Sequence, residues 1–290
     1  MTRVLRGALA ALALTGLSGC GLAQRTAINT TIPIIDNAIV AAYRNGDVEM
    51  MEQALPGNIV LLDGLVETRP DDRRSLELAC QLYVSYSLGF VEDRNSERAT
   101  ALYEKARGYG LRAFPDLAPA GYTGVEGELA YAAELEEYGA DDVEGLVWLA
   151  AAWANSIKGK LSEASALAEL PRLEQLAERL VVLDGDYFYG LPHILLGSIL
   201  TFRPEYLGGD PVRAQEEFDA AFAAGNRSFL LTHLFYARYY CKQAFDEELF
   251  TETLSTMLAA DPNALPDMLL LNRIAQRQGA RLLDQKEELF

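Results

Sequence analysis

The chain has 290 residues, half of them hydrophobic, and it carries a formal net charge of −17. This hydrophobic content is enough for a large core and excludes a wholly disordered chain. So acidic a surface excludes nucleic acid as a natural partner, and anionic lipid headgroups repel it.

The first twenty residues have the layout of a bacterial export signal. Arg3 and Arg6 form a basic head, and an apolar run follows over residues 7–17. This run is well short of the roughly 20 residues that a bilayer-spanning helix needs. Leu17-Ser18-Gly19-Cys20 then matches the lipobox of bacterial lipoproteins. We therefore expect residues 1–19 to be a lipoprotein signal peptide.

Processing at this site would leave Cys20 as an acylated first residue and residues 20–31 as a short lipidated tether. Several acyl chains hold a protein firmly on a membrane. We therefore expect a lipid-anchored protein on the periplasmic side of a bacterial membrane, and Gly21 after the cysteine favours the outer membrane. The alternative is an ordinary secreted protein in which Cys20 is incidental.

From residue 32 onward the apolar residues follow helical spacing, and the alternation typical of strands is absent. Ser96 and Asp210 are predicted N-caps, and residues 114–128 and 203–209 are predicted loops. The pattern predicts helices over residues 33–43, 47–66 with a break at Pro56-Gly57, 76–90, 96–113, 129–138, 141–157, 171–183, 192–200, 211–225, 229–242, 246–259 and 265–283.

Two triplets have the small–aromatic–small spacing of tetratricopeptide repeats. In such repeats the small residues let neighbouring helices approach, and the aromatic residue fills the gap between hairpins. We therefore predict an all-α fold over residues 32–290, an irregular α-solenoid or bundle of tetratricopeptide-like helical hairpins. The triplets, each in the second helix of a predicted hairpin, are Ala99, Tyr103, Ala106 and Ala214, Phe218, Ala221.

Eight segments, in order along nearly the whole chain after the predicted tether, resemble one known family. They are LPGN at 55–58, LLDGL at 61–65, FVED at 90–93, ERA at 97–99, LYEKARGYGLRA at 102–113, LGGDP at 207–211, LFYARYY at 234–240 and LNRIA at 271–275. On these segments the chain resembles the T component of tripartite ATP-independent periplasmic (TRAP) transporters, the TatT lipoproteins.

The resemblance implies a periplasmic, lipid-anchored, all-helical protein with cryptic tetratricopeptide-like hairpins. It also implies a homotrimer whose subunits each carry a tunnel. The implied partner is the P component, the periplasmic substrate-binding protein, and the implied role is to help pass an apolar ligand.

No pattern of residues points to catalysis, a cofactor or a metal site. The two histidines, His193 and His233, lie alone in apolar helices, where a structural role is usual. Glu126 and Glu128, in the predicted Gly-rich loop, are the best candidates for acid–base chemistry, but no nucleophile or motif accompanies them. We therefore do not expect an enzyme.

Two cysteines other than Cys20 occur within predicted helices. Cys80 and Cys241 lie in apolar patterns, which favours buried free thiols, although a periplasmic compartment would permit a disulfide. Whether the two pair is left open by the sequence. The absence of a CxxC motif removes support for zinc or thioredoxin chemistry.

Aromatic residues are dense enough to line a cavity for an apolar ligand. The alternative is that they form the core of the solenoid. The candidates for a ligand tunnel are Tyr83, Tyr86, Phe90, Trp148, Trp153, Tyr187 and Phe188, with Tyr189 beside them.

Two functions remain after these observations. The first is a non-catalytic accessory of a TRAP-type transport system, which docks the substrate-binding protein and passes an apolar ligand. The alternative is an outer-membrane lipoprotein scaffold for the assembly of envelope proteins, whose repeats bind peptide segments.

Overall fold

The computed structural model describes residues 30–118 and 124–290, and every regular element in these two ranges is a helix. The predicted signal peptide, Cys20 and nearly all of the predicted tether lie outside the described residues. Among the described residues, no helix combines the length and the apolar character that crossing a bilayer requires. The prediction of an all-α fold is confirmed.

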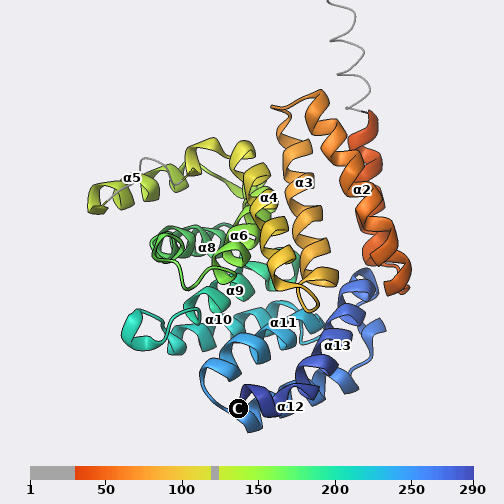
Figure 1. The fold of residues 1–290 in the computed structure, drawn as a ribbon, viewed down its shortest axis with the longest axis vertical. Helices are drawn as coiled ribbons and strands as arrows, with labels where there is room; N and C mark the ends of the chain where they lie inside the picture. The colour runs from red at the N-terminus through yellow and green to blue at the C-terminus, as the bar shows by residue number, and fades with distance from the viewer. Residues whose placement is uncertain (1–29, 119–123) are drawn as a thin grey trace, which may run out of the picture.

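Helices follow one another along the chain with short joints (Figure 1). Residues 30–43 are helical, two π-helices extend α3 and α11, and several joints contain a turn of 3₁₀-helix. The α-helices are α2 (Val48–Thr68), α3 (Arg73–Tyr86), α4 (Ser96–Ala113), α5 (Gly124–Glu136), α6 (Val143–Lys158), α7 (Ala164–Leu167), α8 (Leu170–Asp184), α9 (Tyr187–Leu200), α10 (Pro211–Ala224), α11 (Leu230–Phe235), α12 (Glu247–Ala259), α13 (Leu269–Asp284) and α14 (Lys286–Leu289). The π-helices are η1 (Ser87–Val91) and η5 (Tyr236–Cys241), and the 3₁₀-helices are η2 (Pro115–Leu117), η3 (Ala140–Asp142), η4 (Glu205–Leu207), η6 (Pro262–Ala264) and η7 (Pro266–Met268).

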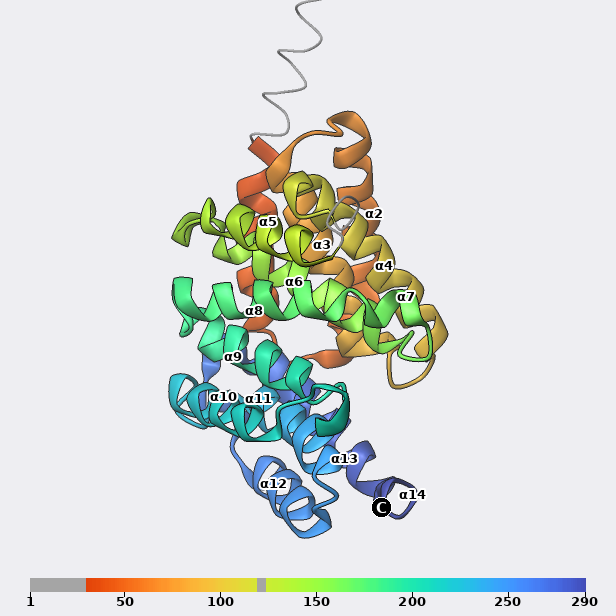
Figure 2. The same cartoon turned by 90° about the vertical axis from the view of Figure 1, so that its left-hand side faces the viewer.

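The two repeat triplets lie in the second helices of two tightly packed hairpins, as predicted. α3 packs on α4, and α9 packs on α10. All six side chains of the triplets are buried, so the small residues lie where the helices meet and Tyr103 and Phe218 fill the space between them. These hairpins stack with α6, α8, α11 and α13 into irregular layers rather than a regular superhelix (Figures 1 and 2).

Side-chain caps fix where several helices begin. Asp72, Asp210 and Asp246 each accept a hydrogen bond from the backbone N–H three residues on, at the starts of α3, α10 and α12. The prediction that Ser96 caps α4 is wrong by one residue. Asn95 is the cap, because its side chain accepts from the Arg98 N–H and leaves Ser96 as the first helical residue.

The predicted break at Pro56-Gly57 is also wrong, since α2 continues through Pro56. Its buried residues recur at helical spacing on both sides of the proline. Packing of that continuous apolar face outweighs the loss of one backbone hydrogen bond at the proline. The buried residues of α2 are Met51, Leu55, Ile59, Leu62 and Val66.

The predicted loop over residues 114–128 is shorter than expected. α5 begins at Gly124, so Glu126 and Glu128 lie in the first turns of a helix and not in a loop. Gly121 lies outside the described residues, and the other two glycines that suggested a loop have structural roles here. Gly124 takes a positive φ of 65° as the chain enters the helix, and Gly127 is buried on the packed face of α5.

Candidate functional site

Two adjoining apolar cavities lie between the helices, and the first reaches the surface at Leu61, which is 50 % exposed. The first, of about 70 Å³, lies between helix 30–43, α2, α3 and α13; the second, of about 60 Å³, lies between α3, α6, α9, α11 and α13. Tyr43, Ser85, Leu271 and Ile274 line both cavities and therefore form the wall between them. Among the described residues, no charged side chain lines either cavity. These cavities are the candidate site.

Tyr43 is the largest side chain in the shared wall. It is the last residue of helix 30–43, and its ring meets the ring of Phe188 edge-on with centroids 5.4 Å apart. Its hydroxyl accepts a hydrogen bond from Gln81 Nε2 at 3.1 Å. Burial raises the pKa of Tyr43 to about 12, so the phenol stays neutral and adds no charge to the cavities.

The π-helix η1 forms the floor of the second cavity through Leu88 and Gly89. A π-turn shifts the backbone ladder and leaves carbonyl groups that need other donors. Two donors come from α13: Gln278 Nε2 donates to the Leu88 carbonyl at 2.6 Å, and Arg277 Nη2 donates to the Gly89 carbonyl at 3.1 Å. Arg94 Nε donates to the Phe90 carbonyl at 3.0 Å. α13 thus holds the cavity floor in its π conformation.

A cluster of charges directly after η1 joins both halves of the chain. Glu92 accepts from Lys158 Nζ and from Tyr103 Oη, both at 2.6 Å, and Arg238 Nη1 lies 3.4 Å from the same carboxylate. Arg238 also contacts Asp93 at 3.1 Å. Burial alone would raise the pKa of Glu92, but the charges of Lys158 and Arg238 hold that pKa at about 2. The cluster fixes η1 against α4, α6 and η5.

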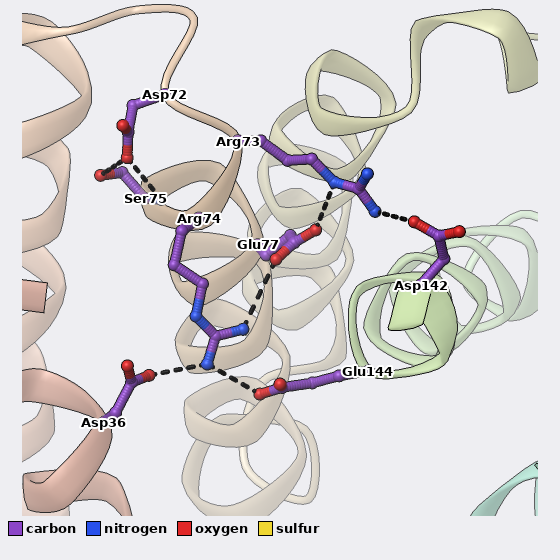
Figure 3. Close-up of polar contacts among 8 residues, drawn as sticks. All are labelled: Asp36, Asp72, Arg73, Arg74, Ser75, Glu77, Asp142 and Glu144. Atoms are coloured by element: carbon purple, nitrogen blue, oxygen red, sulfur yellow. Dashed lines mark hydrogen bonds and ion pairs between the residues drawn. The ribbon is translucent and has the colours of Figure 1, made fainter. Parts of the chain in front are cut away.

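A second network holds helix 30–43 against the body of the protein (Figure 3). Arg74 Nη2 contacts Asp36 at 2.7 Å and Glu144 at 3.0 Å, which links this helix to α3 and α6. Arg73 bridges Glu77 at 2.8 Å and Asp142 at 2.5 Å. A single exposed ion pair contributes little, but a network of several pairs orders the elements that it joins. Because helix 30–43 walls the first cavity, this network also positions the site.

The sequence around this site matches one known protein family. The family model of the TRAP transporter T-component matches residues 44–290. The chain belongs to the TRAP transporter T-component family. No curated protein matches the sequence. Members of this family are accessories of TRAP transport and do not form an enzyme family, and membership implies association with other TRAP components.

The predicted tunnel residues of this T-component fall into two groups. Phe90 lines the first cavity, and Trp148 and Phe188 line the second. Trp148 and Phe188 meet edge-on with ring centroids 5.9 Å apart. These three side chains come from η1, α6 and α9, so the fold brings together aromatic residues that are far apart in the sequence.

The other candidates do not line either cavity. Tyr83 donates its hydroxyl to Asp63 at 2.8 Å, and Trp153 donates Nε1 to Glu169 at 2.7 Å. Tyr86 lies beside Phe90, with ring centroids 6.1 Å apart. Tyr187 is beside Phe188, and Tyr189 instead packs on Phe229 at 5.5 Å between ring centroids.

Sequence reasoning missed all four residues of the shared wall. Tyr43, Ser85, Leu271 and Ile274 are ordinary members of helical patterns, and nothing in their spacing distinguishes them from core residues. The one usable signal was the apolar stripe of helix 30–43, in which Ile35 and Ile39 face the first cavity. That stripe predicts a buried face but not a space beside it.

The remaining candidate groups of the T-component form no reactive arrangement among the described residues. His193 Nδ1 lies 2.6 Å from Glu217 Oε2, which ties α9 to α10. His233 packs against Phe222, and burial lowers its pKa to about 4, so it is neutral. Glu126 and Glu128 are exposed on α5. No group of three or more potential metal ligands occurs within the described ranges.

The two cysteines are free and buried, as the apolar pattern predicted. Burial raises the pKa of both thiols, to about 12 for Cys241, so neither forms an appreciable thiolate at neutral pH. They contribute to the core and have no place in a reactive site.

Proposed function

We propose that this T-component holds an uncharged, apolar ligand in its paired cavities and exchanges it with the substrate-binding protein of its TRAP system. One observation carries the proposal. A protein with a net charge of −17 keeps two adjoining cavities whose described lining contains no charged side chain. Such a site is suited to apolar molecules, because a buried charge without a partner costs several kcal/mol.

The cavities occupy a suitable place for exchange. The first cavity is walled by helix 30–43, whose opposite face is exposed, with Ile34 and Val40 on the surface. A modest displacement of this helix would widen the opening of the first cavity at the surface, and loss of the Tyr43 wall would join it to the second. The ligand would then pass by diffusion and shape, without bond-making.

The location belongs to the same proposal. We place the protein on the periplasmic side of the outer membrane, anchored by acyl chains on Cys20 and assembled as a homotrimer, with residues 1–19 removed and residues 32–290 folded as one helical domain. Replacement of Cys20 by serine should release the protein from membranes. Retention of the Cys20→Ser protein on membranes would contradict the anchor.

The ligand claim is tested with N-phenyl-1-naphthylamine, an uncharged apolar dye whose fluorescence rises in an apolar site. The dye is larger than either cavity, so its binding also requires the displacement of helix 30–43. Ala42 lines the first cavity, whereas its neighbour Ala41 is exposed on the same helix. Ala42→Leu narrows the cavity and should weaken dye binding about tenfold. Ala41→Leu, with the same added volume, should leave it unchanged.

Equal dye binding by both variants and the parent protein would contradict the proposed ligand site. Absence of dye binding by the parent protein would contradict it as well. Circular dichroism of each variant serves as the folding control.

A further inference from the structure

A third apolar feature lies on the outside of the protein, between α5 and α8. One face of each helix walls an open groove of about 380 Å³, which we call the α5–α8 groove. Its apolar side chains are conspicuously exposed: Val125 at 73 %, Leu129 at 68 % and Val182 at 74 %. Three large apolar side chains around one groove suggest a surface that another molecule covers.

The groove exists because α5 has one packed face and one open face. Its buried residues are Gly127, Tyr131 and Leu135, and its main neighbours are α8 and η2. Val125, Leu129 and Ala132 follow helical spacing on the side of the groove. In the α3–α4 and α9–α10 hairpins the two helices cover each other, whereas α5 extends from the body of the protein (Figure 1). The side of α5 that faces the groove is therefore left exposed to solvent.

The rim of the groove is acidic. Glu128 and Glu136 of α5 and Glu178 of α8 line it, and the only basic residue in its described lining is Arg179. Arg179 is already used, because it pairs with Glu136 at 3.0 Å and donates to the Tyr138 carbonyl at 3.0 Å. Residues 124–137 contain five glutamates and no lysine or arginine. Glu178 pairs with Arg213 of α10 at 2.5 Å, so the negative charge at the edge of the groove comes chiefly from Glu128 and the other glutamates of α5.

We propose that the α5–α8 groove docks an amphipathic helix of the TRAP substrate-binding protein, one whose apolar stripe is flanked by lysine or arginine. The identity of that partner rests on the proposed function. Helix-in-groove recognition uses apolar anchors at helical spacing, which the two groove walls match. Basic flanks complement the glutamates, which speed and orient docking. A second copy of this chain fits poorly, because an equally acidic surface would face the same rim.

The test measures affinity between the mature T-component in detergent and the substrate-binding protein of its own transport system, by biolayer interferometry. Val182→Asp places a charge in the apolar part of the groove and should weaken binding tenfold or more, roughly the effect of losing an apolar anchor. Val212→Asp is the matched control, since Val212 is 71 % exposed on α10 and lies outside the groove. It should bind as the parent does. Glu128→Lys should weaken binding and flatten its dependence on salt.

A photo-crosslinking residue at position 129 tests the occupant directly. The expected crosslinked peptide comes from the binding protein and forms a helix with basic residues beside an apolar stripe. Crosslinks to a second copy of this chain would overturn the inference, as would equal affinities for Val182→Asp and Val212→Asp. Absence of any binding by the parent protein would contradict the proposed function as well as this inference, whereas binding that ignores the groove variants would contradict this inference alone.

Discussion

The interior cavities and the α5–α8 groove are both apolar, but they differ in what surrounds the apolar surface. The described cavity walls contain no charged side chain, and ion-pair networks on two sides hold them in place. The groove is open, and glutamates form its edge. A narrow space with uncharged walls suits a small uncharged ligand, whereas a wider surface groove edged by glutamates suits a protein helix. The same molecule therefore separates ligand binding from partner docking.

Replacing Tyr43 by alanine should have the largest effect on the interior. Removal of a buried aromatic ring costs about 3–5 kcal/mol of unfolding free energy, and here it also merges the two cavities. Tyr43→Phe keeps the ring and loses the hydroxyl's hydrogen bonds with Gln81 and Ser85, a loss of about 1 kcal/mol. Urea unfolding gives the energies, and xenon bound in a crystal structure reports whether one space or two exist. Two separate xenon sites in Tyr43→Ala would show that Tyr43 is not the partition.

Lys158→Met tests the support beneath the cavity floor. Removing one partner of a buried charge cluster costs about 3 kcal/mol, the lower end of the usual range because Arg238 still faces Glu92. Lys160→Met is the control, since Lys160 is a more exposed lysine nearby that pairs with Glu104 at the surface. Urea unfolding should show a clearly larger loss of unfolding free energy for Lys158→Met than for Lys160→Met. Similar losses of unfolding free energy in both variants would mean that the Glu92 cluster stabilises the fold no more than a surface ion pair does.

The pH dependence of stability tests the contribution of Glu92 to the same cluster. Glu92 has a pKa of about 2 in the folded protein, below the ordinary value of 4.5. Its ionised form therefore stabilises the fold at pH values above the unfolded pKa, and this contribution disappears as the pH falls from about 5 towards 2. The stability difference between the parent protein and Glu92→Gln should be constant above pH 5 and shrink below it. A difference independent of pH would contradict the assigned role of Glu92.

Substitution in the groove should have the smallest effect on stability. Val182→Asp changes an exposed side chain, so we expect a change within about 0.5 kcal/mol in unfolding free energy. Partner binding, not folding, should respond. If thermal unfolding of Val182→Asp shifted as much as that of Tyr43→Ala, the groove would belong to the folding core and the contrast between the two regions would fail.

The sequence predicted helix bounds correctly where capping residues and apolar stripes determine them. The apolar stripe and the opposite charged face of residues 96–113 set the bounds of α4, and Asp210-Pro211 marked the start of α10. The break at Pro56 was predicted wrongly, because a local rule for proline could not include the packing of the whole face of α2. Helix ends therefore lie where local sequence signals predict them, unless tertiary packing favours a longer helix.

The site was less accessible to sequence reasoning, since a cavity is defined by the side chains that fail to fill it. Aromatic density pointed to Phe90, Trp148 and Phe188, three of the residues that line the cavities. The shared wall joins Tyr43 to Leu271 across almost the whole chain, and no local pattern records that contact. The π-helix η1 depends in the same way on Arg277 and Gln278 of α13.

Calorimetry with octan-2-one and octanoate tests the central claim most directly. The two molecules have the same carbon chain, but only octanoate carries a charge, and burying that charge without a partner costs several kcal/mol. Cavities with uncharged walls should therefore bind the ketone at least about a hundredfold more tightly than the carboxylate. Equal or tighter binding of octanoate at the site narrowed by Ala42→Leu would contradict the account.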